Sequence, residues 1–171
     1  MSGYERIRQQ ARTLVKRHGT RNPFIIADEM GIHVRFCNDF IKLKGFYKVI
    51  DRSRFIFINA NLDEHEQQVI CAHELAHDTL HRTLVKSGIL QEIMLYDMKS
   101  RPEYEANVFA AEILLDDNVV YELAQDGFDE EQIASELCVD ADLVRIKMNE
   151  MNKQGYKFNL SRVPRGDFLG R

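Results

Sequence analysis

Cysteine is scarce in this sequence, and the cysteines that occur are not arranged for a structural role. Cys37, Cys71 and Cys138 are an odd number of widely spaced residues and include no Cys-x-x-Cys pair. This spacing argues against a disulfide framework and against a zinc site made of thiolates. Because thiols that stay reduced are typical of the cytoplasm, we expect a cytoplasmic protein.

Long hydrophobic runs are missing as well, and so is a large excess of charge of one sign. The first ten residues carry charges where a secretory signal needs an apolar stretch, and nowhere do about 18 apolar residues follow one another. The 23 basic and 27 acidic residues give a formal net charge of -4. We therefore expect no export, no membrane anchor and no overall positive field that would draw the protein to nucleic acid.

The sequence does contain enough apolar material for one compact unit, since 44% of its 171 residues are hydrophobic. Apolar residues at helical spacing predict a first helix over Tyr4–His18. A short second helix is expected to start near Asn22-Pro23 and to end at Gly31, because proline suits a first turn and glycine the position after a last one. The N-terminal part is thus predicted to be helical.

The pattern changes after Gly31. Short β-branched and aromatic runs at residues 32–36, 45–50 and 55–58 predict strands, with a turn at residues 51–53. We interpret them as a small antiparallel sheet of about three strands. Residues 54–58 are also a candidate to bind an extended substrate by strand addition, with a plain core strand as the alternative.

Helices are predicted for most of the remaining chain. Asp63 and Glu66 form a capping-box signature, and an apolar stripe continues to about Arg82, so one helix is expected there. A further helix is expected at about 102–115, and residues 83–99, which show no clean period, are interpreted as an irregular rim over a cleft.

The C-terminal part is expected to form a separate helical unit. Two or three helices should fill residues 119–152, with a break at Gly127. We therefore divide the chain into a core at 1–117, a helical subdomain at 118–152 and a basic, mobile tail at 153–171.

The pattern that carries chemistry lies within the helix that begins at Asp63. In His73-Glu74-Leu75-Ala76-His77, the two histidines are four residues apart and project from one helix face, so both imidazoles can reach one zinc ion. Glu74 lies about 100° round the helix from His73, where its carboxylate can act as the general base on a zinc-activated water. The alternative is a chance match on an ordinary helix.

A catalytic zinc needs a third protein ligand and an open position. In one class of zinc proteases the motif continues as His77-x-x-Gly-x-x-His and its last histidine is the third ligand. Here Leu80 and Thr83 stand at the glycine and histidine positions, which favours a carboxylate ligand. We assign Glu103 as that ligand and Asn107, on the same helix face, as the group that hydrogen-bonds a ligand imidazole. Glu105 is the rival ligand, on nearly the opposite face of the helix.

Several neighbouring residues have more than one interpretation. Glu103 also fits a capping box that starts at Ser100. His81 lies one turn beyond His77, too far along the helix to share the same ion with both motif histidines, so we expect it at the rim or beside a ligand. Tyr96 and Tyr104 are candidates to stabilise the oxyanion, with simple packing as the alternative.

These residues resemble the ImmA/IrrE-type metallopeptidases, which lie near the gluzincins. The resemblance covers most of the chain from Asn22-Pro23 onward, and residues 103–115 are its most discriminating block. It implies a zinc endopeptidase that cleaves a helix-turn-helix repressor encoded nearby, in a mobile element, prophage or stress-response locus. The sequence departs from the family at Asp116, where relatives commonly have proline, and at Asn107, where many have aspartate. An amide at position 107 would orient an imidazole without adding negative charge.

Residues 130–144 have the rhythm of a helix-turn-helix with a tight turn near Cys138-Val139. The second helix begins with Asp140 and Asp142, however, where contacts with phosphates and bases favour basic or amide side chains. We therefore expect this unit to pack on the core or to dock the substrate through its acidic face, and not to bind DNA directly.

The sequence thus predicts an α+β, zincin-like domain with a small three-stranded antiparallel sheet packed on helices, plus a C-terminal helical subdomain. We expect a metalloprotease with one zinc ion per chain, acting on a helix-turn-helix repressor in transcription regulation. The alternative is a non-catalytic regulator that holds zinc structurally and binds a repressor or DNA. A closed site of four ligands would favour the regulator, whereas three ligands and an open position would favour the enzyme.

Overall fold

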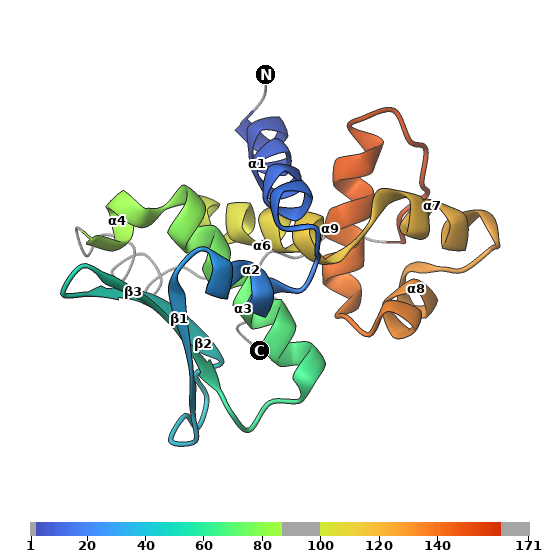
Figure 1. Cartoon of the computed structure of the whole chain (residues 1–171). Coiled ribbons are helices and arrows are strands. Elements are labelled where there is room, and N and C mark those ends of the chain that lie inside the picture. Colours follow the sequence, from blue (N-terminus) through green and yellow to red (C-terminus); the bar gives the residue numbers. More distant parts are fainter. Residues whose placement is uncertain (1–2, 87–99, 162–171) are drawn as a thin grey trace.

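The computed structural model describes residues 3–86 and 100–161. Within these ranges the chain forms eight helices and three strands and has a mixed α+β architecture, as predicted. In chain order the elements are α1 (Gly3–His18), α2 (Pro23–Glu29), β1 (Ile32–Cys37), β2 (Gly45–Ile50), β3 (Ser53–Asn59), α3 (Glu64–Leu80), α4 (Arg82–Lys86), α6 (Arg101–Leu114), α7 (Asp117–Gln125), α8 (Glu130–Leu137) and α9 (Ala141–Asn152). Figure 1 shows the sheet at one side of the molecule and α7, α8 and α9 at the other. No helix among the described residues is long and apolar enough to cross a membrane.

The three strands form one sheet in the order β1-β3-β2. β2 and β3 are antiparallel and are joined by a tight turn at Asp51 and Arg52, both with positive φ. β1 and β3 are parallel, so the prediction of an antiparallel sheet is wrong for this pair. The chain reverses once between β1 and β2 and again between β2 and β3, and β1 therefore runs in the same direction as the central strand that it joins.

One face of the sheet packs against α3. Ile56 and Ile58 of β3 are fully buried, as are Ala72 and Leu75 of α3. β2 packs tightly against α3 at Gly45, where a Cβ atom would lie 2.5 Å from Ile70 Cγ2 and 2.7 Å from the carbonyl oxygen of Phe57. Glycine is required at this position because any side chain would push the edge strand away from the helix.

Helix α3 begins where the capping signature predicts. The Asp63 side chain accepts a hydrogen bond of 2.9 Å from the backbone nitrogen of Glu66. On its side away from the sheet, α3 packs against α6, which offers Ala106, Ala110 and Ala111 as buried small residues. Small side chains let the two helices approach closely, and this places side chains of α6 beside the His73–His77 motif.

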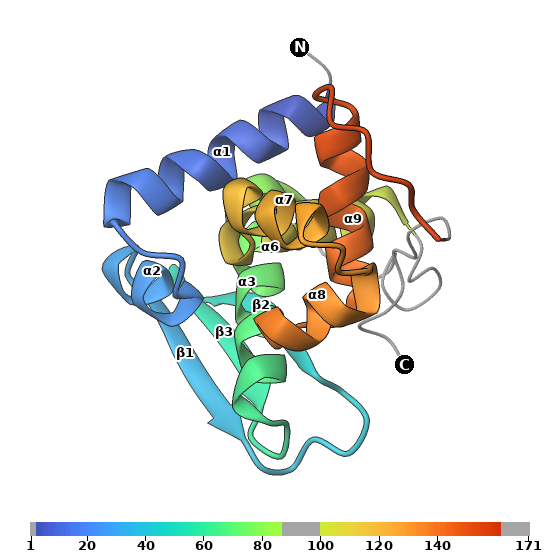
Figure 2. The same cartoon turned by 90° about the vertical axis from the view of Figure 1, so that its right-hand side faces the viewer.

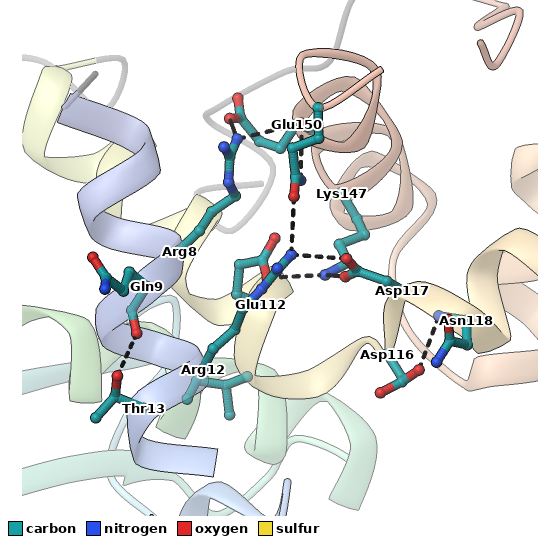
Figure 3. Close-up of polar contacts among 12 residues, drawn as sticks. Arg8, Gln9, Arg12, Thr13, Glu112, Asp116, Asp117, Asn118, Lys147 and Glu150 are labelled. Carbon is teal, nitrogen blue, oxygen red and sulfur yellow. Dashed lines mark hydrogen bonds and ion pairs between the residues drawn. The ribbon is translucent and has the colours of Figure 1, made fainter. Parts of the chain in front are cut away.

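Three helices follow residue 116 where two or three were expected, with a break at Gly127, where φ is 90°. α9 packs on α6 through a fully buried lysine, Lys147, whose Nζ lies 3.1 Å from Glu112 of α6. Arg12 of α1 lies 2.9 Å from the same carboxylate and also contacts Asp117 of α7 (Figure 3). One network of charged side chains, in which Lys147 and Glu112 are buried and Arg12 is exposed, therefore joins the C-terminal helices to the core.

The segment after α9 is packed as far as the structure describes it. Tyr156 and Phe158 stack on each other and both contact Tyr121 of α7. Asn152 exchanges hydrogen bonds of 2.7 and 3.0 Å with the backbone of Phe158, and the backbone nitrogen of Ser161 donates to Glu130 at 2.7 Å. These contacts link residues 156–161 of the predicted tail to α7, α8 and α9, and residues 162–171 lie outside the described part. Figure 2 shows this segment running down the outer side of α9.

Candidate metal centre

Three side chains from two helices converge in the interior of the molecule. α3 contributes His73 and His77, which are 4% and 1% exposed, and α6 contributes Glu103, which is 3% exposed. The two histidine Nε2 atoms are 3.2 Å apart, and the Glu103 carboxylate lies 3.1 Å from His73 Nε2 and 3.4 Å from His77 Nε2. Among the described residues this is the one group of three that could hold a metal ion.

The spacing of these atoms matches a tetrahedral zinc site. Ligand atoms about 2.0–2.1 Å from a tetrahedral ion lie about 3.3–3.4 Å from one another. The three observed separations, 3.1, 3.2 and 3.4 Å, are close to that edge length. The side chains are therefore arranged as ligands would be before any ion is considered.

The position of the proton on neutral His73 is also compatible with a bound metal ion. His73 Nδ1 lies 2.8 Å from Asn107 Oδ1, so in the neutral ring the proton is on Nδ1 and the lone pair is on Nε2. That lone pair faces the Glu103 carboxylate, which only accepts hydrogen bonds and whose Oε1 has no hydrogen-bond partner among the described residues. Two acceptors that face each other in a buried site need a proton or a metal ion between them.

Without a metal ion, a proton on His73 lies between this ring and Glu103. Burial alone lowers the pKa of His73, but the hydrogen bond and charge of Glu103 outweigh it and raise this pKa to about 9. Burial alone raises the pKa of Glu103, but its contact with His73 lowers the pKa to about 2. Burial and the charge of His73 lower the pKa of His77 to about 3. An ionised carboxylate beside an imidazole that stays neutral attracts a positive ion.

Glu74 lies beside this group without belonging to it. The side chain is buried and its Oε2 atom has no hydrogen-bond partner among the described residues. Burial raises its pKa to about 7, against the opposing effects of the His73 charge and a hydrogen bond from the Tyr47 backbone. A carboxyl group that gains and loses a proton near neutral pH is suited to general acid–base work.

Sequence reasoning missed the residue that ties the motif helix to the sheet. Asp78, next to His77, is buried and accepts hydrogen bonds from the Tyr47 hydroxyl at 2.7 Å, from Arg54 at 3.0 Å and from Arg82 at 2.8 Å. These contacts hold β2 and β3 against α3. An acidic residue within an otherwise buried stretch of helix was the only signal available in the sequence.

The structure describes three of the four remaining candidates. Asn107 lies beside His73 as described, while Glu105 contacts His81 and Arg101 instead of the cluster. Tyr104 packs its ring on Tyr4, and its hydroxyl group hydrogen-bonds with α9, so it does not reach the site and its assignment as an oxyanion donor is withdrawn. Its position one residue after Glu103 turns it toward α1 and α9. Tyr96 lies outside the described residues.

The strand-addition candidate is also corrected by the sheet order. Residues 54–58 belong to β3, which is central and pairs on both sides, so its backbone groups are already used. The edge strand on the side of α3 is β2, and among the described residues no strand pairs with its outer edge. The sheet thus has two edge strands, β1 and β2, and β2 contacts both α3 and α4.

The sequence of this chain is similar to known metallopeptidases. Residues 27–154 match the model of the peptidase M78 family, described as the IrrE N-terminal-like domain. The chain is 31% identical over 150 residues to the metallopeptidase ImmA of Bacillus subtilis (strain 168), and the match covers 85% of each chain. It is 35% identical over 144 residues to uncharacterized immunity region protein 2 of Bacillus phage phi105, covering 84% of this chain and 90% of that protein. The residues that converge on one point in the structure all lie within the matched range.

Proposed function

The chain belongs to the peptidase M78 family of metallopeptidases, and on that premise we propose that it is a zinc-dependent endopeptidase with His73, His77 and Glu103 as the metal ligands. The observation that carries the proposal is the convergence of two imidazole nitrogens 3.2 Å apart with one carboxylate. Two histidines and one glutamate are a ligand set of catalytic zinc sites, which keep a position open for water and substrate.

Glu74 performs the proton transfers in this proposal. Zinc, when bound, supplies a Lewis acid that polarises a peptide carbonyl and acidifies water. The Glu74 carboxylate takes a proton from the attacking water and then delivers it to the amine nitrogen that leaves. Its Oε2 atom has no competing hydrogen bond among the described residues and is available for that proton.

The substrate is proposed to lie along β2. This edge strand is joined to the active-site helix by the hydrogen bond from the Tyr47 hydroxyl to Asp78, and the Tyr47 backbone hydrogen-bonds with Glu74. A peptide that pairs with the open edge of β2 would therefore run past Glu74 in an extended form. Backbone pairing of this kind aligns a peptide and leaves its side chains to provide specificity.

The decisive experiment removes the base and retains the ligands. Glu74→Gln should bind zinc like the wild type and lose cleavage, because the amide cannot accept the proton. The matched control is Glu64→Gln, an exposed residue in the first turn of the same helix. Cleavage products of a candidate substrate are identified by mass spectrometry. Retained cleavage by zinc-loaded Glu74→Gln would refute the assigned role.

We propose a helix-turn-helix repressor as the substrate, docked on an acidic face of α7 and α8. Residues 118–144 contain eight acidic residues and neither lysine nor arginine. Two of the eight, Glu130 and Asp142, are buried. The other six are exposed and define the acidic face: Glu122, Asp126, Asp129, Glu131, Glu136 and Asp140. A positive DNA-binding surface is complementary to such a face.

Charge reversal separates docking from chemistry. Glu122→Lys combined with Glu136→Lys should slow association with an intact repressor while leaving hydrolysis of a short peptide across the cleavage site unchanged. Asp28→Lys combined with Asp39→Lys changes the net charge equally at exposed positions elsewhere and is the control. Equal effects of the two pairs would show that only net charge matters.

We prefer the peptidase to the non-catalytic alternative for two reasons. The metal-binding group found in the described residues has three members, where a structural site uses four. In α9, which takes the place of a recognition helix, Arg145 and Lys147 are buried and paired with carboxylates. These cations are therefore not available to DNA phosphates.

A further inference from the structure

A chain of side-chain contacts leads away from the candidate metal centre on the side of His77. His77 Nδ1 lies 3.1 Å from His81 Nδ1, and His81 Nε2 lies 3.0 Å from Glu105 Oε2. The other oxygen of Glu105 accepts a hydrogen bond of 2.6 Å from Arg101. His81 is 5% exposed, so its two contacts are formed in the interior of the protein.

The direction of each hydrogen bond follows from the carboxylate at the end of the chain. Ionised Glu105 can only accept, so His81 carries its proton on Nε2. The Nδ1 atom of neutral His81 is then an acceptor, so the proton between the two rings belongs to His77 Nδ1. This leaves the lone pair of His77 on Nε2, the nitrogen that faces His73 and Glu103.

We propose that His81 and Glu105 form a positioning relay that holds His77 in its metal-binding tautomer and transmits the negative charge of Glu105 to that ligand. The proposal rests on the proposed function, since it takes His77 as a metal ligand. The Nδ1 atom of His73 contacts the neutral amide of Asn107. Among these contacts, the negative charge that supports the two histidines comes from Glu105, on the His77 side. Groups of this kind orient a ligand imidazole and raise its basicity.

The local structure places both members of the relay. His81 is the C-cap of α3, and its backbone nitrogen donates to the carbonyl of His77 at 3.1 Å. This places the His81 ring next to the His77 ring, one helical turn further along α3. Glu105 is on α6, two residues after the proposed ligand Glu103, and turns toward the end of α3 instead of toward the cluster. Arg101 precedes Glu105 by one helical turn and fixes its carboxylate.

The relay is tested first by zinc affinity. His81→Phe removes the acceptor, and we expect zinc binding, measured by competition with a chromogenic chelator, to weaken about 10- to 100-fold. Glu105→Gln should weaken it about tenfold, at the lower end of the same range. The double variant should bind zinc no more weakly than His81→Phe alone, because both changes interrupt one path. His65→Phe, an exposed histidine in the first turn of α3, is the matched control.

A second measurement reports the tautomer directly. In the zinc-loaded wild type, nitrogen-correlated NMR of the histidine rings should show the proton of His77 on Nδ1 and that of His81 on Nε2. His81→Gln offers an oxygen acceptor to His77 and should retain the His77 tautomer with an intermediate zinc affinity. Urea unfolding of the metal-free variants checks that each one is folded, and a structural role alone would not change the tautomer.

Additive losses in the double variant, wild-type affinity of folded His81→Phe, or a proton on His81 Nδ1 would each overturn the relay. These outcomes are separate from a failure of the proposed function. If the tautomers are as stated but no protein is cleaved, the relay stands and the peptidase proposal fails. If His81→Phe binds zinc normally and Glu74-dependent cleavage persists, the relay fails and the peptidase proposal stands.

Discussion

Two glutamates of α6 provide a sharp test of the candidate metal centre. Glu103 and Glu105 are two residues apart, so their side chains point about 200° apart around the helix. The Glu103 carboxylate lies 3.1 and 3.4 Å from the two histidine nitrogens, whereas Glu105 contacts His81 and Arg101. Glu103→Ala should therefore remove a ligand, and Glu105→Ala should remove only support for one.

The expected magnitudes follow from these two positions. Loss of a group that supports a ligand weakens metal binding about 10- to 100-fold, so loss of a ligand should exceed about 100-fold. A hundredfold loss of affinity corresponds to about 2.8 kcal/mol. Because saturating zinc stabilises the folded state in proportion to the logarithm of its affinity, the zinc-dependent part of the unfolding free energy should fall by at least that amount in Glu103→Ala. In Glu105→Ala it should fall by about 1.4 kcal/mol, which corresponds to a tenfold loss.

The assay is urea unfolding of each variant with excess zinc and with chelator. The difference between the two curves isolates zinc binding, because any effect of the substitution on the metal-free fold is present in both. A larger loss for Glu105→Ala than for Glu103→Ala would show that the wrong face of α6 has been assigned to the metal. Equal, small losses in both variants would show that neither carboxylate is a ligand.

Three further outcomes are expected. Metal analysis of the purified protein should find one zinc ion per chain, and excess chelator should stop cleavage until zinc is restored; protein that neither contains nor takes up zinc would contradict the site. Lys147→Met should lower the free energy of unfolding by about 3 kcal/mol, the lower end for a broken buried pair, because Arg12 remains 2.9 Å from Glu112. A loss below about 1 kcal/mol would show that the network in Figure 3 is not essential to the attachment of α9. Tyr47→Phe should cost about 1.5–3 kcal/mol in urea unfolding, because it removes a hydrogen bond to the buried carboxylate of Asp78; an unchanged midpoint would show that this contact does not tie β2 to α3.

The features that could be predicted from the sequence are local ones. Helix α3 starts at the cap formed by Asp63, and the break at Gly127 separates two helices, because capping and backbone freedom act within a few residues. The facing of His73 and His77 follows from the helical period alone. The choice of Glu103 over Glu105 for contact with the histidines is also a matter of helical period, once one knows which face of α6 meets α3.

The features that sequence could not supply depend on where distant segments meet. Which strand occupies the centre of the sheet depends on the path of the whole chain. The β1–β3 pair was therefore assigned the wrong direction, and strand addition was considered at β3, which is central. Tyr104 was a plausible oxyanion donor until α1 and α9 were seen to pack on its side of α6.

Tertiary packing also decided which charged residues are buried and what supports the ligands. Lys147 looks like a surface residue in the sequence, yet it is fully buried because Glu112 and Asp117 meet it from two other helices. The contact between His81 and Glu105 joins residues 24 positions apart. The residue pattern by itself indicated the proposed ligands on α3, since their facing depends on spacing within one helix. The contacts of Glu103 with the histidines, of His81 with Glu105 and of Tyr47 with Glu74 were decided by the packing of α6 and the sheet against that helix, since each requires groups that only the folded chain brings together.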